Sequence, residues 1–156
     1  ELTLKRVPPP PPPPPEEEFE TFTINEPIRL NRIYYDLDDD KILPESEPDL
    51  QIVLELMNEY SDMVIELGSH TDSQGRYAYN ENLSQRRADS AKQWLTEKGI
   101  PDARIETKGY GETQILNHCT NGVKCSDDEH RFNRRTVFTI IAGPTEIKIK
   151  KKRLKG

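Results

Sequence analysis

The chain has 156 residues, enough for one ordinary domain with extensions but not for two large hydrophobic cores. Its hydrophobic fraction is only 33% and its formal net charge at pH 7 is −6, which argues against nucleic-acid binding by general electrostatic attraction. No apolar run approaches the roughly 20 residues of a membrane-spanning helix. No signal peptide is visible, and because the chain begins at Glu1 we interpret it as a mature or excised fragment.

Residues 1–18 are predicted to be a proline-rich linker. Val7 is followed by eight consecutive prolines, Pro8 to Pro15, and then by three glutamates. Such a run forms a stiff polyproline helix of roughly 3 Å per residue, which neither packs a core nor joins a sheet. We interpret it as a spacer that follows an upstream domain. A docking ligand for an SH3-type groove is the alternative.

Residues 19–142 carry the alternating strand and helix patterns of a folded domain. β-Branched and aromatic residues predict a first strand over residues 28–35, and an acidic loop follows it. The next helix is predicted to begin near Ser46, because apolar residues recur at positions i, i+3, i+4 and i+7. These residues are Leu50, Val53, Leu54 and Met57.

The second half of the domain repeats this alternation. A half-buried strand is predicted over residues 63–67, and a second helix over residues 80–98 ends before Gly99. The remaining elements are a strand over residues 104–109, a long loop over 112–132 and a last strand over 136–141. This βαβαβ-β order predicts an α/β (α+β) sandwich in which two main helices pack on a mixed sheet.

The final segment, residues 143–156, is expected to be a basic C-terminal tail. The stretch from Lys148 to Lys155 is strongly basic, whereas the acidic groups are spread through the body of the chain. A charge run of this kind is most simply a solvated terminus.

The long loop contains both cysteines of the chain, Cys119 and Cys125. A disulfide that closes this short loop is the favoured interpretation, and it implies an oxidising compartment. A metal site that also uses His118 and His130 is an alternative, although the spacing matches no common zinc pattern. Two free thiols are the third possibility. We expect a disulfide, no metal and no cofactor.

Asp72 and Arg87, fifteen residues apart, form the most informative pair. Arg87 shares a helix face with Leu83, Ala91 and Trp94 at helical spacing. A guanidinium within an apolar arc needs a compensating acceptor, and Asp72, on the turn before the helix, is the natural candidate. One anion beside one fixed cation suits a zwitterion such as the end of an amino acid. The alternative is a structural ion pair that locks the turn to the helix.

Two neighbours of this pair are given structural roles. Arg86 lies about 100° around the helix from Arg87 and is expected to face solvent. His70 is expected to be a structural hydrogen-bonding residue of the strand-to-turn junction rather than a ligand contact.

Five motifs occur in order along the chain. They are Gly68-Ser-His-Thr-Asp-Ser-Gln-Gly75, Asn80-x-x-Leu83-Ser84-x-x-Arg87-Ala88, Gly99-Ile100, Gly109-Tyr-Gly111 and Asn133-Arg134-Arg135. Together they resemble the OmpA-like peptidoglycan-binding domain, a family that includes peptidoglycan-associated lipoprotein and the flagellar stator protein MotB. The resemblance covers about residues 22–142. The cysteine-bearing loop is an elaboration that suits outer-membrane proteins of the Bacteroidetes type.

The resemblance implies noncovalent binding of peptidoglycan through the diaminopimelate residue of its stem peptide. In this interpretation Asp72 accepts hydrogen bonds from the ligand's ammonium group, and Arg87 binds its carboxylate through two N–H groups. Tyr35 and Asp36 match ligand-contacting positions, partly through backbone groups. The other implied ligand-binding residues are Thr71, Asn80, Leu83 and Arg134.

The resemblance also implies a periplasmic domain that anchors an outer-membrane protein to the cell wall. An upstream membrane-embedded or lipid-anchored domain is expected, and homo-oligomerisation is left open. No catalytic residue is expected, because neither a G-x-S-x-G elbow nor an H-E-x-x-H metal motif is present. A hydrolase that acts on peptidoglycan and a purely structural oligomerisation domain are the alternative functions.

Overall fold

The computed structural model describes residues 7–13, 18–36 and 38–154. Parts of the predicted linker (1–6 and 14–17), Leu37 and the last two residues of the predicted tail lie outside the described residues. Residues 7–13 form neither helix nor strand and are exposed to solvent. Within the described part of the chain, each helix is too short or too polar to cross a membrane.

The described elements follow one another in the order that the sequence predicted, with additions at both ends. They are β1 (Phe19–Thr23), β2 (Pro27–Tyr34), α1 (Glu47–Glu59), β3 (Val64–His70), α2 (Tyr77–Glu97), β4 (Ile105–Gly111), α3 (Asp127–Arg131), β5 (Arg135–Ala142), β6 (Glu146–Lys150) and α4 (Lys151–Leu154). Short 3-10 turns precede α1 and β4.

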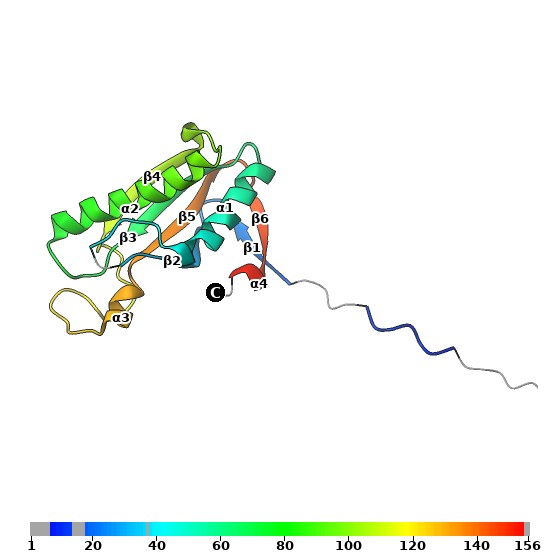
Figure 1. The fold of residues 1–156 in the computed structure, drawn as a ribbon, viewed down its shortest axis with the longest axis horizontal. Helices are drawn as coiled ribbons and strands as arrows, with labels where there is room; N and C mark the ends of the chain where they lie inside the picture. Colours follow the sequence, from blue (N-terminus) through cyan, green and yellow to red (C-terminus); the bar gives the residue numbers. More distant parts are fainter. Residues whose placement is uncertain (1–6, 14–17, 37, 155–156) are drawn as a thin grey trace, which may run out of the picture.

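The central sheet has the strand order β2-β5-β3-β4, in which β3 and β4 are parallel and the other neighbours are antiparallel. Helices α1 and α2 contact each other and lie on the same face of this sheet (Figure 1). The predicted mixed sheet with two main helices is therefore confirmed. Because parallel strands end at the same edge, the turn after β3 and the long loop after β4 leave the sheet side by side.

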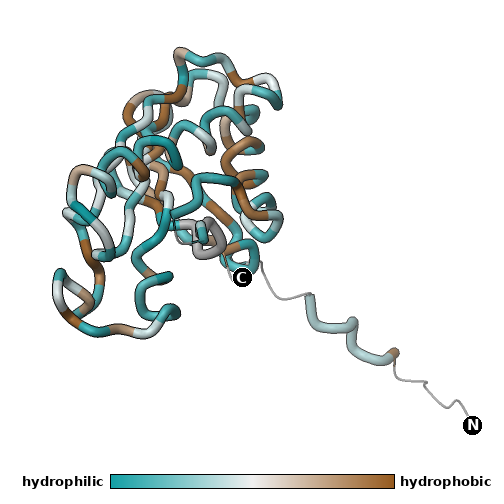
Figure 2. The backbone as a smooth tube through the Cα atoms, turned by 60° about the vertical axis from the view of Figure 1, so that its left-hand side comes forward, coloured by the Kyte–Doolittle hydropathy of each residue, from teal (hydrophilic) through white to brown (hydrophobic). Residues whose placement is uncertain are grey.

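The core lies between the sheet and the two helices. The four residues that predicted α1 (Leu50, Val53, Leu54 and Met57) are all buried, and Ile65 and Leu67 of β3 are buried opposite them. Figure 2 shows hydrophobic stretches of backbone on the helices and strands inside the folded body. Burying one such side chain stabilises the fold by about 1.5–3 kcal/mol, so this layer fixes where α2 and its arginines lie.

Helix α2 packs very closely on β4. A side-chain carbon on Gly109 would lie 2.4 Å from the backbone nitrogen of Gln85, so only glycine allows this approach. The helix begins at Tyr77, three residues before the predicted start, because the turn already ends at Gly75, whose φ is +90°.

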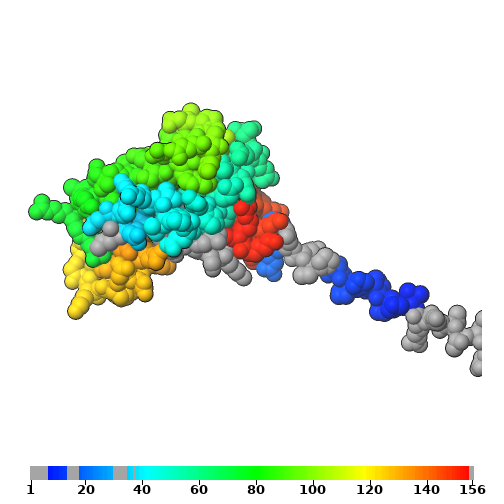
Figure 3. Space-filling view, in the orientation of Figure 1, coloured from blue at the N-terminus to red at the C-terminus, as the bar shows by residue number. Residues whose placement is uncertain are grey.

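The expectation of a solvated tail over residues 143–156 is corrected by the structure. Strand β6 pairs antiparallel with β1, and its residues Ile147 and Ile149 are buried. In Figure 3 this C-terminal segment, in red, packs beside the surface of α1. The isoleucines alternate with lysines, which is the period of a half-buried strand, and the high density of charge concealed that pattern in the sequence.

Candidate functional site

The turn after β3 holds Asp72 in a braced, buried position. The backbone N–H of Thr71 donates to the carbonyl of Gly111 at 2.9 Å, which fastens the turn to the end of β4. Gln74 donates to both carboxylate oxygens of Asp72, from its backbone N–H at 2.9 Å and from its side-chain amide at 3.2 Å. The amide of Asn80 donates to the carbonyl of Gln74 at 2.9 Å. Asp72 is consequently only 2% exposed.

Arg87 is fully buried, as its helix face predicted, but main-chain carbonyl groups hold it. Its Nε donates to the carbonyl of Asp39 and its Nη2 to that of Asp36, both at 2.8 Å. The guanidinium lies 4.9 Å from the centre of the Tyr35 ring. Burial lowers the pKa of Arg87 to about 10, so it stays charged at neutral pH. Its Nη1 is buried and has no hydrogen-bond partner among the residues that the structure describes.

The predicted pairing of Asp72 with Arg87 is wrong in its details, because the direct partner of Asp72 is Arg134. Arg134 Nη1 lies 2.7 Å from Asp72 Oδ2, and both side chains are 3% exposed. Arg134 also donates from Nε to the carbonyl of Tyr35 at 3.0 Å and from Nη2 to Asp127 at 3.2 Å. Asp72 still raises the pKa of Arg87 through its charge. Main-chain carbonyl groups of the acidic loop are therefore the acceptors for Arg87, in place of the Asp72 carboxylate that we predicted from the sequence.

These groups surround one narrow recess, which is too small to hold a water molecule in this structure. Its lining residues are Asp38, Thr71, Asp72, Gln74, Asn80, Leu83, Arg87 and Arg134. Six of the eight predicted ligand-binding residues therefore meet at one place. They come from the turn after β3, from α2 and from the residue before β5. The recess combines an anion, two buried guanidinium groups and an apolar wall.

Tyr35 and Asp36, the other two predicted residues, lie outside this lining and support it. The Tyr35 hydroxyl donates to the backbone carbonyl of Arg87 at 3.0 Å and also bonds Thr136 at 3.0 Å. Burial raises the pKa of Tyr35 to about 12, so the ring is neutral. The Asp36 side chain is exposed, and its carbonyl is already bonded to Arg87. Both residues thus position Arg87.

Asp38 and Gln74 line the recess but were missed as site residues. Asp38 adopts a left-handed backbone conformation with φ of 59°, which short polar residues tolerate best. The run of aspartates in this loop was the available signal. Gln74 stands two residues after Asp72, where a turn returns the backbone N–H to the aspartate side chain.

Arg86 faces solvent, as expected, and it also contacts the acidic loop. Its Nη1 lies 3.0 Å from Asp40, and its Nε donates to Asn82 at 3.0 Å. The side chain is 43% exposed, so this pair is a weak surface contact. Adjacent arginines of α2 nevertheless both contact the acidic loop, one from outside and one from inside.

His70 is structural, as expected, but through stacking. Its ring lies parallel to that of Tyr110, with centroids 4.9 Å apart. Its Nδ1 is buried without a hydrogen-bond partner. Burial, together with the charges of Arg135 and Arg29, lowers the pKa of His70 to about 3. The residue is neutral at ordinary pH, and it is not among the residues that line the recess.

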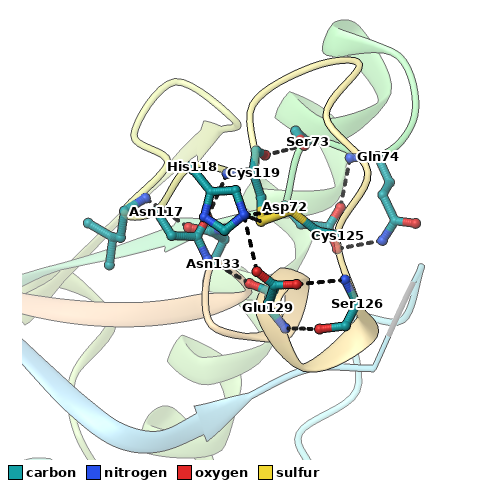
Figure 4. The surroundings of a disulfide bond; sticks show 11 residues. Asp72, Ser73, Gln74, Asn117, His118, Cys119, Cys125, Ser126, Glu129 and Asn133 are labelled. Atoms are coloured by element: carbon teal, nitrogen blue, oxygen red, sulfur yellow. Dashed lines mark hydrogen bonds and ion pairs between the residues drawn. A yellow bond between two sulfur atoms is a disulfide. The ribbon is translucent and has the colours of Figure 1, made fainter.

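The predicted disulfide between Cys119 and Cys125 is present, and its loop lies against the turn that carries Asp72 (Figure 4). The Ser73 hydroxyl donates to the carbonyl of Cys119. On the other side of the same loop, Asp127 contacts Arg134. The disulfide loop and α3 therefore form an outer support of the recess.

Comparison with known proteins shows which family and which characterised proteins this chain resembles. The profile of the OmpA family matches residues 34–128. Outer membrane porin F of Pseudomonas fluorescens is 40% identical over 82 residues, which cover 53% of this chain and 25% of the porin. The peptidoglycan-associated lipoprotein of Mesorhizobium japonicum is 30% identical over 121 residues, 78% of this chain and 67% of the lipoprotein.

A solved structure shows the same fold. The crystal structure of the peptidoglycan-associated lipoprotein from Burkholderia pseudomallei matches with a TM-score of 0.62 and 22% identity, covering 69% of this chain and 87% of that one. The chain thus spans about a quarter of the porin's length but most of this solved domain.

Proposed function

Because this chain belongs to the OmpA family, we propose that its folded domain binds peptidoglycan noncovalently and so anchors an outer-membrane protein to the cell wall. The matched relatives are a porin and lipoproteins associated with peptidoglycan, and the domain is a binding module, not an enzyme. A periplasmic location and an upstream membrane-attached domain are part of this proposal. The disulfide supports it, since disulfides persist in oxidising compartments.

The ligand group that fits the recess best is the zwitterionic end of a diaminopimelate side chain. The unpartnered Nη1 of Arg87 carries this inference. A buried N–H without an acceptor costs about 1–3 kcal/mol, and more on a charged group. A carboxylate in the recess would supply the acceptor, and Arg134 stands on the same lining to share its charge.

Asp72 would receive the ammonium group of the same ligand. A carboxylate has roughly four acceptor directions, and three donors from Gln74 and Arg134 already use part of this capacity. One direction remains for an ammonium N–H. Asp38 stands on the same lining and adds negative charge on that side. The ligand's two charges would then face opposite charges of the protein.

The size of the recess limits what can enter. In this structure the side chains that line the recess leave no room for a water molecule. Entry of the terminal amino-carboxylate group of a ligand would therefore require these side chains to move apart, and a whole peptide or sugar could not follow it. The rest of the stem peptide would lie on the surface around the opening.

Calorimetric titration of the 156-residue chain with diaminopimelate tests this proposal. The amide of Nα-acetyl-lysine is the matched ligand, because it keeps the terminal ammonium group and has no carboxylate. We expect Arg87→Lys to weaken diaminopimelate binding by at least about 30-fold, since truncating one partner of a buried charge pair costs 2–5 kcal/mol. Arg86→Lys, its exposed neighbour, should leave the affinity unchanged.

Two results would contradict the assignment. Equal affinity of the amide of Nα-acetyl-lysine and of diaminopimelate would show that the carboxylate beside the ammonium group is not recognised. Retention of full affinity by Arg87→Lys would show that the ligand binds elsewhere. For the anchoring function, purified peptidoglycan sacculi should sediment with the protein and release no soluble fragments; release would indicate a hydrolase.

A further inference from the structure

The disulfide lies within a cluster of side chains that resembles a metal-ligand set. Figure 4 shows His118 and Glu129 turned toward Cys119 and Cys125. One candidate ligand atom from each of the four residues lies within 4.8 Å of all the others. His118 Nε2 is 3.7 Å from Cys125 Sγ, 4.0 Å from Cys119 Sγ and 3.2 Å from Glu129 Oε2.

Contacts other than the S–S bond hold these groups together. Ser126 and Glu129 form a reciprocal cap of α3, in which the Ser126 N–H donates to Glu129 Oε1 at 3.0 Å and the Glu129 N–H donates to Ser126 Oγ at 3.2 Å. These bonds from Ser126 lower the pKa of Glu129 below its ordinary value. Asn117 accepts from the Cys119 N–H at 3.1 Å and donates to the Glu129 carbonyl at 2.9 Å. The loop therefore has its own scaffold around the cluster.

We propose that the reduced form of this loop binds one zinc ion through Cys119, Cys125, His118 and Glu129. Two thiolates, one imidazole and one carboxylate are all ordinary zinc ligands, and four such groups complete a tetrahedral site. Two zinc-bound sulfurs stand roughly 3.8 Å apart at tetrahedral angles. Reduction of the disulfide frees the two sulfurs to separate to that distance.

The chemistry balances with an external dithiol as the reductant. A thiolate of the dithiol attacks one sulfur of the disulfide, and its second thiol resolves the mixed disulfide. The dithiol is thereby oxidised to a disulfide, and Cys119 and Cys125 become thiols. Zinc binding then displaces one proton from each thiol, so that the metal is held by two thiolates.

The structure selects a ligand that the sequence did not suggest. Sequence spacing offered His130 as the fourth member of a metal site, but it is Glu129 that stands in the cluster. His130, the next residue of α3, is buried, and its Nδ1 has no hydrogen-bond partner among the described residues. Glu129 is the third residue after Ser126, the N-cap of α3, and this position brings its side chain to the cysteines. The positions of the histidines in the sequence do not indicate this ligand.

The metal would take over the mechanical role of the disulfide. Cys119 accepts a hydrogen bond from Ser73, the residue after Asp72, so the closed loop supports the wall-binding turn. A reduced loop without metal loses its covalent closure, whereas a zinc ion bound to the same cysteines closes it again.

Metal titration of the reduced protein tests the site without reference to peptidoglycan. The 156-residue chain is reduced with a phosphine under argon, freed of reductant and titrated with cobalt(II), then with zinc to displace it. We expect a one-to-one complex with intense sulfur-to-cobalt absorption in the near ultraviolet, and zinc binding at least about 100-fold tighter than in the oxidised chain.

Substitutions at His118 and Glu129 keep both thiols. They therefore distinguish a four-ligand metal site from a site made by the two thiols alone. His118→Gln and Glu129→Gln should each weaken zinc binding by about tenfold or more, and His130→Gln is the matched control that should not. Circular dichroism of the reduced variants confirms folding. Equal affinity in the oxidised and reduced chains, or full affinity in both His118→Gln and Glu129→Gln, would overturn the proposal. Loss of diaminopimelate binding with zinc binding intact would instead contradict only the wall-binding function.

Discussion

Arg87 and Arg104 are two arginines anchored by main-chain carbonyl groups in different regions of the molecule. Arg104 stands just before β4, where its Nε donates to Met63 at 2.9 Å and its Nη2 donates to both Met57 and Tyr60 at 2.7 Å. These acceptors lie at the C-terminal end of α1 and the start of β3. Arg87 stands beside the recess and donates to two carbonyl groups of the acidic loop.

The two arginines differ in the surroundings of the N–H groups that do not bond to a carbonyl group. Arg104 is partly exposed, so its remaining N–H groups can reach water, and its whole role is to cap a helix end. Arg87 is 0% exposed and its Nη1 has no partner. Anchoring by carbonyl groups therefore does not by itself mark a binding arginine. In our proposal the distinguishing feature of Arg87 is a buried donor that the described residues leave without an acceptor, beside the recess.

The largest effect is expected at the recess, from Asp72→Asn. Removing this charge deprives the ligand's ammonium group and Arg134 of their common partner, and we expect diaminopimelate affinity to fall by at least about 30-fold. Asp128→Asn, an exposed change of one charge on α3, is the control. Calorimetry at neutral pH measures both. Unchanged affinity in Asp72→Asn would show that the recess does not bind diaminopimelate.

The second prediction distinguishes Arg104 from Arg87 by its contribution to the free energy of unfolding. Arg104→Ala removes a charged donor from three carbonyl groups and should lower the free energy of unfolding by about 2–3 kcal/mol, while diaminopimelate affinity stays the same. Urea unfolding and calorimetry measure the two quantities. A parallel loss of affinity would mean that the Arg104 region also shapes the recess.

The third effect concerns the disulfide that supports the recess. Opening a loop of this length, in which the two cysteines have a sequence separation of 6, should lower the free energy of unfolding by roughly 2 kcal/mol. Reduction in the presence of a metal chelator should also weaken diaminopimelate binding several-fold, because Ser73 loses a fixed acceptor. Thermal unfolding and titration of the reduced chain check both. Unaltered affinity would show that the loop is not a support of the turn.

The smallest effect tests whether any unpartnered buried nitrogen marks a site. His70 also has one, but it does not line the recess, so His70→Phe should keep full affinity at pH 7. The folded pKa of about 3 lies below the ordinary 6.5. The stabilisation that the neutral, buried His70 gives to the fold is therefore complete above pH 6.5 and is lost as the pH falls toward 3.

Between pH 6.5 and pH 5 the loss from His70 should be about 2 kcal/mol. Urea unfolding at several pH values measures this slope, and His70→Phe, which keeps the stacked ring, should reduce it. Identical slopes in the two proteins would contradict the buried, neutral histidine.

Much of the fold followed from local pattern. The apolar spacing of α1, the alternation of β3 and the glycine after α2 each report on neighbouring residues, and the structure confirms these elements within a few residues at their ends. Strands β1 and β6 escaped prediction because they pair with each other across more than 120 positions, from Phe19 to Lys150. Neither strand has a local partner that its sequence could indicate.

The candidate site shows the same division. Helix periodicity indicated that Arg87 is buried and that Asp72 was a candidate partner, whereas the resemblance to the OmpA-like domain implied that Asn80, Leu83 and Arg134 belong with them. Only the tertiary structure decided which acceptor each guanidinium takes. Arg87 donates to carbonyl groups of a distant loop and Arg134 to Asp72, since hydrogen-bond partners depend on direction and distance in space, which residue types do not encode.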